Sequence, residues 1–395
     1  MVKPLDNITI LDFSRVLAAP MATQILADLG AAVLKVERPG TGDETRGFEP
    51  RLGRDESAYF FAFNRGKKSI TLDLRSQDGR AAALALARTA DVVVENFLPG
   101  TMDRLGLGYE TLSAANEKLI YLAATGFGQT GPERSRKGYD TIFQALSGIM
   151  SLTGHPAGDP TKVGVPIADL TSGLWVAIGV LTGLVGRAQH GRGTYIDIAM
   201  MDVQISLLAL AAARVFALDE DPARTGTEHP GRVPSAAFEC LDGWVHISGS
   251  DQHWIPLCES LGLVDLAEDP ELATNAGRLQ HRRHVMEELR SVIREQDRAE
   301  LVAVLSAVGI PVGEVRTVKE ALAAPQVASR GMLGSFDHPT VGSFPALKTP
   351  VRFLGYDNPG FEPPPLLGAD TDTVLKQISA PASTDWPGPS DEEVD

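Results

Sequence analysis

The chain has 395 residues and a formal net charge of −15, and 43% of its residues are hydrophobic. This composition is typical of a globular protein with two or three domains, and the acidic balance argues against non-specific binding to nucleic acid. Two cysteines, Cys240 and Cys258, fit a reducing compartment and show no metal-ligand spacing. Residues 1–11 lack a signal-peptide pattern, and we expect no membrane-spanning segment. We therefore expect a cytoplasmic protein with no bound metal and no membrane partner.

In chain order, the first half of the sequence predicts a parallel α/β sheet. Strand and helix patterns alternate from residue 8 onward, beginning with a β-α-β unit. The first turn lacks a G-x-G-x-x-G pattern, which disfavours dinucleotide binding of the usual Rossmann type. The helices predicted at 174–189 and 202–218 are apolar almost all round. We expect both to be buried in the core, with an oligomer interface as an alternative for the helix at 202–218. Strands are predicted at 8–13, 31–37, 69–74, 91–96, 119–125 and 194–200, and helices at 20–29, 78–90, 139–146, 174–189 and 202–218.

The remaining segments indicate a second, inserted domain. A polar stretch at 219–234 with three prolines marks a domain boundary. Earlier in the chain, residues 39–66 form a long Gly/Arg/Asp-rich loop. We predict a large α/β domain made of residues 1–220 and a return segment 321–385, a smaller α+β domain at 225–320, and a disordered tail at 386–395. Beyond the boundary we expect a hairpin at 238–248, helices at 254–261, 276–295, 298–308, 318–328 and 371–378, and strands at 311–315, 332–338 and 351–353.

One carboxylate stands out in this chain. Asp169 is the only ionisable group in the stretch V-G-V-P-I-A-D-L-T-S-G at 163–173. Burying a bare carboxylate is costly unless a partner or backbone N–H groups meet it. The residues that follow open a helix, so Asp169 is either an ordinary helix cap or a carboxylate nucleophile held bare at a helix start.

Eight motifs, each in register along the chain, resemble one enzyme family. They are similar to those of the family III CoA-transferases, the group of formyl-CoA transferase and of the carnitine and bile-acid CoA-transferases. The resemblance runs from about residue 5 to residue 379. The motifs are L-D-F-S-R-V-L-A-A-P (11–20), L-G-A-A-V-L-K-V-E-R-P (29–39), N-R-G-K-K-S-I-T-L-D-L (64–74), V-E-N-F-L-P-G (94–100), T-G-F-G-Q-T-G-P (125–132), K-G-Y-D (137–140), A-D-L-T-S-G (168–173) and P-L-L-G-A-D-T-D (365–372).

The resemblance implies a fold, an assembly and a catalyst. The fold is a Rossmann-like large domain with a parallel sheet, formed from both chain ends, plus a smaller inserted α+β domain, in a homodimer of interlocked rings. The resemblance implies that Asp169 is the nucleophile, which forms a mixed anhydride with the acyl group and then an aspartyl-CoA thioester. Acyl-CoA and a small carboxylic acid are the implied substrates, with no permanently bound cofactor.

Other site residues follow from the same resemblance. A loop covering the site, with oxyanion donors, is implied at Ser248, Gly249, Ser250, Asp251 and Gln252. This loop lacks the longer glycine run of formyl-CoA transferase, which puts formate and oxalate in doubt as substrates. His229 and Arg232 are further substrate candidates, and Arg15, Arg46, Arg65 and Lys68 are weaker anion-binding candidates. The implied CoA-binding residues are Val16, Leu17, Arg38, Leu72, Arg75, Asn96, Phe97, Met102, Arg104, Lys137 and Tyr139.

Three functions remain open from the sequence. The first is a CoA-transferase whose donor is a dicarboxylic acyl-CoA such as succinyl-CoA. The second is an acyl-CoA racemase or epimerase, which Tyr139 disfavours because the related racemases have a histidine base at this position. The third is a non-catalytic CoA-binding protein, which Asp169 disfavours.

Overall fold

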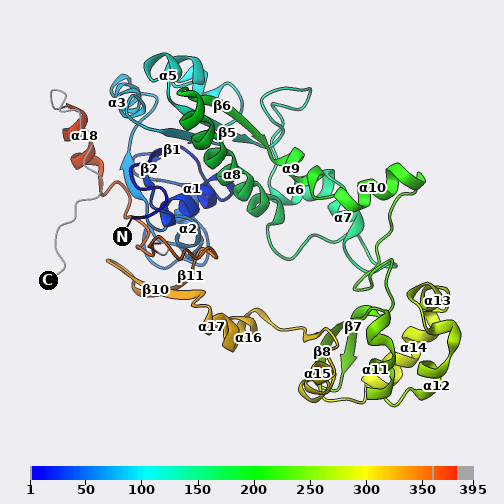
Figure 1. Cartoon of the computed structure of the whole chain (residues 1–395). Coiled ribbons are helices and arrows are strands. Elements are labelled where there is room, and N and C mark those ends of the chain that lie inside the picture. The colour runs from blue at the N-terminus through cyan, green and yellow to red at the C-terminus, as the bar shows by residue number, and fades with distance from the viewer. Residues whose placement is uncertain (1, 358–359, 380–395) are drawn as a thin grey trace. The chain divides into compact units, whose positions relative to one another are not determined.

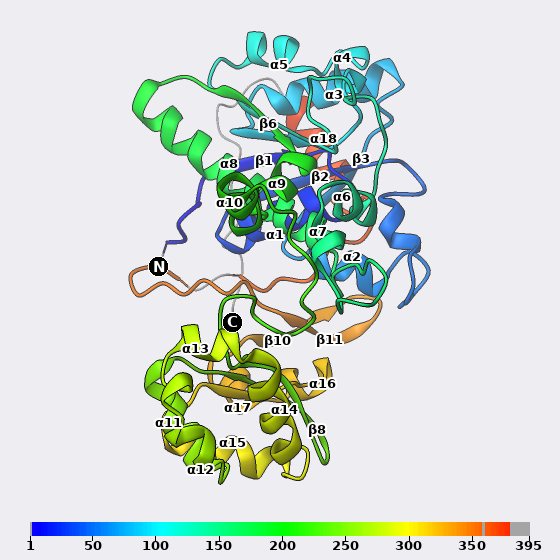
Figure 2. The same cartoon turned by 90° about the vertical axis from the view of Figure 1, so that its right-hand side faces the viewer.

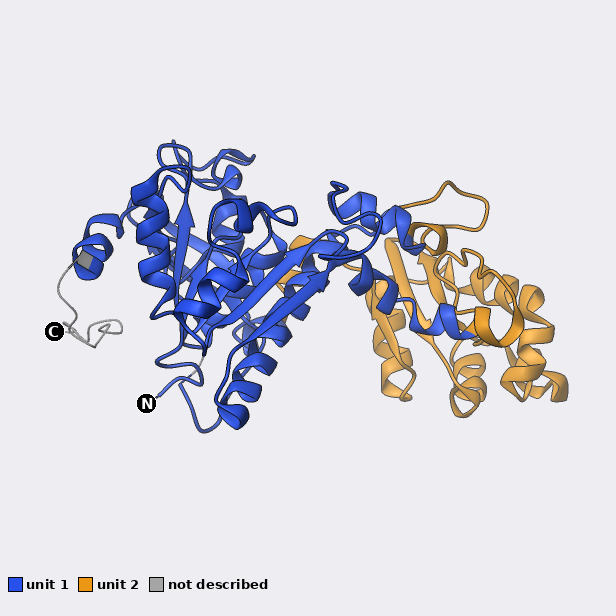
Figure 3. Ribbon diagram, turned by 90° about the horizontal axis from the view of Figure 1, so that it is seen from above, with its two compact units in different colours: residues 1–149, 162–213, 326–395 blue, residues 150–161, 214–325 orange. Residues whose placement is uncertain are grey.

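The computed structural model describes residues 2–357 and 360–379, so the predicted tail at 386–395 lies outside the described residues. The chain divides into two compact units, each assembled from separate stretches of sequence (Figure 3). Unit 1 comprises Met1–Ile149, Lys162–Ala213 and Gln326–Asp395, and unit 2 comprises Met150–Thr161 and Arg214–Pro325. The predicted boundaries did not anticipate that 150–161 packs within unit 2.

Unit 1 is built on a six-stranded sheet in which every pair of neighbours is parallel, as predicted for this α/β fold. The strand order is β3-β2-β1-β4-β5-β6, so the connection reverses direction between β1 and β4. Ligands of open α/β sheets bind beyond the carboxyl ends of the strands at such a reversal. The strands are β1 (Thr9–Asp12), β2 (Ala32–Glu37), β3 (Lys68–Thr71), β4 (Val92–Glu95), β5 (Ile120–Thr125) and β6 (Thr194–Ala199).

Helices cover both faces of this sheet because successive strand side chains point to opposite sides. Ile10 packs in a core with α1 and α8, whereas its neighbour Leu11 packs in a second core with α3, α5 and α18 (Figures 1 and 2). The helices of this unit, with those that begin or end at its borders, are α1 (Ala18–Asp28), α2 (Ala58–Phe63), α3 (Gln77–Ala87), α4 (Thr101–Arg104), α5 (Tyr109–Ala115), α6 (Asp140–Leu146), α7 (Ile149–Leu152), α8 (Ile167–His190), α9 (Met200–Ser206), α10 (Ala209–Leu218), α17 (Pro325–Ser329) and α18 (Thr371–Ser379), with a short 3₁₀ helix η1 (Glu44–Gly47).

The two apolar helices differ from their predictions. Helix α8 begins at Ile167, seven residues before the predicted start at 174, and leaves an apolar face exposed that includes Trp175 at 44%. By length and composition alone α8 is long and apolar enough to cross a membrane, a test that a buried core helix also passes, so the expectation of no membrane-spanning segment stays a prediction. Its other face packs on α1, β5 and β6. The predicted single helix at 202–218 is two helices, α9 and α10, bent by 64°.

The crossing of α1 and α8 depends on a glycine. A Cβ on Gly173 would lie 2.6 Å from the Ala18 carbonyl oxygen, whereas a Cβ on Gly186 of the same helix would meet nothing within 4 Å. We expect Gly173→Ala to destabilise the fold by about 1–3 kcal/mol through overpacking. The matched control Gly186→Ala should be neutral or stabilising by up to about 1 kcal/mol. Urea unfolding measures both variants, and equal stabilities would contradict this view of the crossing.

Unit 2 has its own sheet and core. Strands β7 (Ser235–Cys240), β8 (Gly243–Ser248) and β9 (Val312–Glu314) form an antiparallel sheet, which matches the predicted hairpin and strand. Trp254, Phe238 and Leu289 lie in its apolar core. The helices are α11 (Asp251–Ser260), α12 (Val264–Glu268), α13 (Asn275–Gln280), α14 (Arg282–Ile293), α15 (Arg298–Ala307) and α16 (Val318–Leu322), with a 3₁₀ helix η2 (Pro270–Leu272).

Three predicted elements of the second half are wrong in detail. The helix expected at 276–295 is interrupted at His281. The helix expected at 318–328 is interrupted before Pro325, because a proline in the interior of a helix breaks its hydrogen bonding. No strand forms at 351–353. Instead, β10 (Leu333–His338) pairs with β11 (Gly342–Leu347), a strand that the sequence reading missed.

Candidate active site

Asp169 lies in the first turn of α8, whose N-cap is Pro166. It is therefore neither the N-cap nor the residue before one, because the helix starts earlier than the sequence indicated. Its carboxylate accepts no hydrogen bond within the part of the chain that the structure describes. Burial, and then the negative charge of Asp140, raise the pKa of Asp169 to about 7. The group is thus poised between its acid and carboxylate forms near neutral pH.

Asp140 is a neighbour that the sequence reading did not single out. It is the first residue of α6, and one carboxylate oxygen accepts the backbone N–H groups of Ala168 at 2.8 Å and Asp169 at 3.3 Å. The motif K-G-Y-D drew attention to Tyr139 instead, whose side chain is 77% exposed. Nothing in the sequence marks Asp140 for this contact, because its partners Ala168 and Asp169 lie almost thirty residues further along the chain.

Tyr59 is a second neighbour of the carboxylate. It belongs to α2 and is half-buried, and its pKa is raised to about 12 by burial and then by the charges of Asp169, Asp140 and Asp43. Its ring also packs edge-on against Phe48 and Phe63. The sequence analysis treated 39–66 as one long loop, so the short helix that carries Tyr59 was missed.

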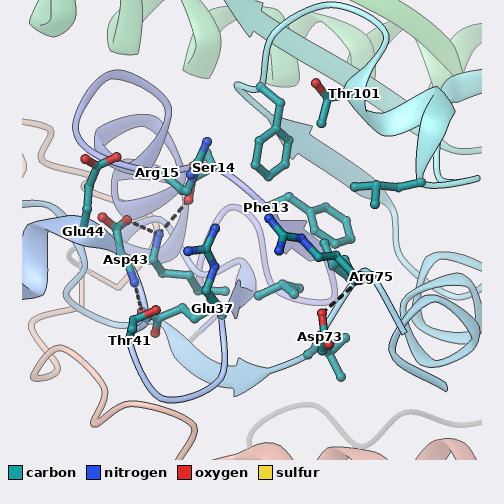
Figure 4. A pocket seen from close by; sticks show the side chains of 18 residues that line it. Phe13, Ser14, Arg15, Glu37, Thr41, Asp43, Glu44, Asp73, Arg75 and Thr101 are labelled. Atoms are coloured by element: carbon teal, nitrogen blue, oxygen red, sulfur yellow. Dashed lines mark hydrogen bonds and ion pairs between the residues drawn. The ribbon is translucent and has the colours of Figure 1, made fainter. Parts of the chain in front are cut away.

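A cavity of about 540 Å³ opens beyond the carboxyl ends of the central strands of unit 1 (Figure 4). Four of the predicted CoA-binding residues line it: Arg38, Leu72, Arg75 and Phe97. Among the described residues, neither the Arg38 nor the Arg75 guanidinium forms an ion pair, and the Arg75 guanidinium points into the cavity in Figure 4. Two unpaired guanidinium groups on one cavity are suited to phosphate oxygens.

The other predicted CoA-binding residues do not line this cavity. Asn96 accepts the Arg15 backbone N–H at 2.9 Å and donates to the Arg15 carbonyl at 2.8 Å, so it fixes the turn after β1. Leu17 and Met102 are buried in the core. Arg104 donates to the Thr101 hydroxyl, and Lys137 and Tyr139 are exposed.

The backbone at Val16 is unusual. This β-branched residue has φ of 70°, a left-handed conformation that only surrounding structure can hold. Its N–H faces the Asp43 carboxylate, with the nearer oxygen at 3.3 Å. Asp43 thus holds the turn beside the cavity in place.

A buried network of charges includes two residues that line the cavity, Lys35 and Asp43. Lys35 forms an ion pair of 2.9 Å with Asp43 and donates to the Ser14 carbonyl at 2.8 Å. Lys67 forms an ion pair of 3.2 Å with Asp12, and all four charged side chains are buried. Burial opposes the charged form of Asp43, but the charge of Lys35 and the hydrogen bonds from Thr45 lower its pKa. The sequence reading missed this network.

The weaker anion-binding candidates have mostly structural contacts. Arg46 forms a two-pronged ion pair with Glu37, and Arg65 forms one with Asp28; all four side chains are buried. Arg15 differs, since it lines the cavity with its guanidinium 4.8 Å from the Phe97 ring centre.

The remaining candidates lie in unit 2. Ser248 ends β8, Gly249 follows it, and Ser250 caps α11 in a box with His253. Asp251 accepts bonds from buried Arg278 and from the Asn275 backbone, and Gln252 follows it in α11. His229 and Arg232 are exposed, and His229 Nδ1 accepts the Gly231 N–H. Their role at Asp169 stays a prediction. In residues 2–357 and 360–379 we find no group of side chains suited to hold a metal ion.

Three comparisons with known proteins agree on one family. The family model described as CoA-transferase family III matches residues 5–371. The chain is 38% identical to succinyl-CoA:glutarate CoA-transferase of Mus musculus, over 95% of this chain and 87% of that one. It is 39% identical to acetyl-CoA:oxalate CoA-transferase of Acetobacter aceti, over 96% of both chains. The crystal structure of a CAIB/BAIF family protein from Brucella suis matches with a TM-score of 0.87 at 39% identity, covering 96% of this chain and all of that one.

Proposed function

The chain belongs to the family III CoA-transferases, and from this premise we propose that it moves CoA from a dicarboxylic acyl-CoA, such as succinyl-CoA, to a second carboxylic acid through Asp169. One observation carries the assignment of the nucleophile. Asp169 presents a half-buried carboxylate without a hydrogen-bond partner in the described residues, with a pKa of about 7. A carboxylate that is partly desolvated and accepts no hydrogen bond is more basic and more nucleophilic than an ordinary solvated one.

The proposed reaction balances without any additional reactant. An Asp169 oxygen attacks the thioester carbonyl, the C–S bond breaks, and the CoA thiolate leaves a mixed anhydride on the enzyme. The thiolate then attacks the Asp169 carbonyl, which releases the first acid as a carboxylate and leaves an aspartyl-CoA thioester. The acceptor carboxylate attacks that thioester, which breaks its C–S bond, releases the CoA thiolate and forms a second mixed anhydride. The thiolate finally attacks the acceptor's carbonyl, which gives the new acyl-CoA and restores the Asp169 carboxylate. No net proton is consumed.

The surroundings of Asp169 suit a reaction that must exclude water. Ala168 is fully buried, and Ile167 and Leu170 on either side are partly buried. Water that reached either intermediate would hydrolyse it, so apolar neighbours protect the transferred group. Oxyanion donors from the segment 248–252 remain part of the proposal.

The choice of acids rests on the relatives. One relative is named for succinyl-CoA and glutarate and another for acetyl-CoA and oxalate, at nearly equal identity. The lack of a long glycine run at 248–252 therefore does not by itself exclude oxalate. We propose a dicarboxylic donor because the mouse relative is named for succinyl-CoA and glutarate, and Arg232 stays a candidate for the second carboxylate. A panel of acyl-CoA donors and free acids, followed by liquid chromatography, tests this choice.

One experiment distinguishes a racemase from a CoA-transferase. Tyr139 has no imidazole to move a proton, and it stands exposed at the N-cap of α6. We expect no deuterium uptake at the α-carbon of a 2-methylacyl-CoA incubated in heavy water. Exchange faster than CoA transfer would favour the racemase.

We also propose that a second copy of this chain covers the apolar face of α8, in the interlocked homodimer that the family resemblance implies, and that the protein is cytoplasmic. Leu174, Trp175, Ile178 and Val185 are each more than two-fifths exposed in the single chain. Exposed apolar area of this kind marks an interface. Light scattering coupled to gel filtration tests the dimer, and a monomer would contradict it.

Removing an unpaired cation from the cavity should weaken CoA binding. We expect Arg38→Ala to raise the KM for the acyl-CoA about tenfold with little change in kcat, because the lost contact serves ground state and transition state alike. Arg88→Ala is the matched control, since that arginine is exposed and does not line this cavity. Equal KM values for the two variants would place CoA elsewhere.

A further inference from the structure

The nucleophile is held by a second acid from another helix. Helix α8 has 24 residues, but its N-cap Pro166 contributes no side-chain hydrogen bond to the first turn. Asp140 of α6 supplies that bond instead, accepting the N–H groups of Ala168 at 2.8 Å and of Asp169 itself at 3.3 Å. These N–H groups have no partner within a helix, so a capping carboxylate stabilises them. Asp140 thereby fixes the backbone from which the Asp169 side chain projects.

Asp140 is itself fixed from the other side. Its second oxygen accepts the Gln144 amide N–H at 2.6 Å, and the Gln144 amide oxygen accepts the Val163 N–H at 2.8 Å. Gln144 is fully buried. The carboxylate therefore has defined partners on both oxygens, which ties α6 to the segment that leads into α8. An incidental surface acid has no such support.

The contact also has an electrostatic consequence. The amino end of a helix favours a nearby carboxylate and would ordinarily lower the pKa of an acid in its first turn. Here Asp140 accepts from those same N–H groups, and its charge repels that of Asp169. The charge of Asp140 on α6 acts on Asp169 of α8, and the charges of Asp169, Asp140 and Asp43 act on Tyr59 of α2. With burial as the larger cause and Asp140 as the second, the pKa of Asp169 is raised to about 7.

We propose that Asp140 is a positioning residue for the CoA-transfer reaction, which occupies the helix N–H groups so that the Asp169 carboxylate stays bare, basic and aimed at the thioester. The inference deepens the proposed function and rests on it. Asp140 touches neither substrate nor the reacting atoms in this role. It acts only through the backbone and the charge state of Asp169.

The variant Asp140→Asn separates charge from capping. Asparagine keeps one acceptor oxygen for the two N–H groups and removes the negative charge, although its NH₂ group can no longer accept the bond from Gln144. The acid limb of the profile of kcat/KM against pH should then move to lower pH, part of the way toward the ordinary range of an aspartate, since burial remains. We expect the ratio of activity at about pH 6 to that at about pH 8 to rise several-fold, and the activity at about pH 8 to fall because a less basic carboxylate is a weaker nucleophile. The KM for the acyl-CoA should stay within about twofold.

Controls make each outcome decisive. Glu133→Gln removes an exposed carboxylate from the same stretch of chain and should leave the pH profile unchanged. Asp140→Ser, a shorter uncharged cap, should move the acid limb in the same direction, and it serves if Asp140→Asn does not fold. A folded, active uncharged variant with the wild-type pH profile would overturn the inference. If instead the wild-type protein transfers no CoA, or Asp169→Asn keeps transferring it, the proposed function itself has failed.

Discussion

Asp169→Asn is expected to lower the rate of CoA transfer by at least about 10⁴-fold, the loss typical of removing a covalent nucleophile. Asparagine has nearly the shape of aspartate, but its amide cannot form the mixed anhydride. Because the reaction has no other group to carry the acyl chain, binding of acyl-CoA alone should give no turnover. The measurement is the initial rate of new acyl-CoA formation, with binding of CoA to the variant followed separately by calorimetry.

The same variant should remain folded, and this is its control. Burial and Asp140 raise the pKa of Asp169 above its value in the unfolded chain, so its cost to stability grows as the pH rises above the ordinary aspartate pKa and is complete above about pH 7. Asparagine removes that cost, and we expect Asp169→Asn to be at least as stable as the parent near pH 8 by urea unfolding. Full activity in a folded Asp169→Asn protein would show that another residue is the nucleophile.

Asp43→Ala is expected to destabilise unit 1 by about 3–5 kcal/mol, the cost of leaving a buried charge without its partner. Asp43 pairs with Lys35 at 2.9 Å, and both side chains are fully buried. It also accepts the N–H and hydroxyl of Thr45 and faces the strained backbone at Val16. Since these residues border the cavity, CoA binding should weaken together with stability. Urea unfolding and CoA titration measure the two effects.

The neighbouring Glu44 supplies the matched control. Glu44 is exposed and also borders the cavity, so Glu44→Ala should change stability by no more than about 0.5 kcal/mol. The pH dependence gives a further check. The pKa of Asp43 is lower than in the unfolded chain, so its stabilising effect is present above the ordinary aspartate pKa and is lost as the pH falls through the lowered value. Equal unfolding energies for Asp43→Ala and Glu44→Ala would show that the pair is not important.

The sheet could be predicted from sequence because its strands are short apolar runs separated by helices. Ile10 and Leu11 both face cores, as buried parallel strands require, and such runs are conspicuous. Asp169 could be found because no other ionisable group lies within 163–173. The helix start was predicted at Leu174, seven residues too late, although Pro166, which precedes the first helical residue, is of a type that commonly stands near the beginning of a helix.

The rest of the site could not be predicted for a physical reason. Lys35 lies within a strand, and a charge there ordinarily indicates an exposed position; only the fold brings Asp43 to it. Asp140 contacts residues 28 and 29 positions away, and no periodicity reports such a pairing. The exposed face of α8 was expected to be buried, since an all-round apolar helix pattern does not show which of its faces the rest of the chain covers.

Trapping the intermediate tests the central claim most directly. The protein is incubated with succinyl-CoA and hydroxylamine, digested, and examined by peptide mass spectrometry. Hydroxylamine attacks the activated Asp169 carbonyl of either the anhydride or the thioester and leaves a stable hydroxamate. The account predicts that adduct on Asp169, dependent on the acyl-CoA and absent from Asp169→Asn. Transfer of CoA that proceeds with Asp169 unlabelled, or with the label on another residue, would contradict it.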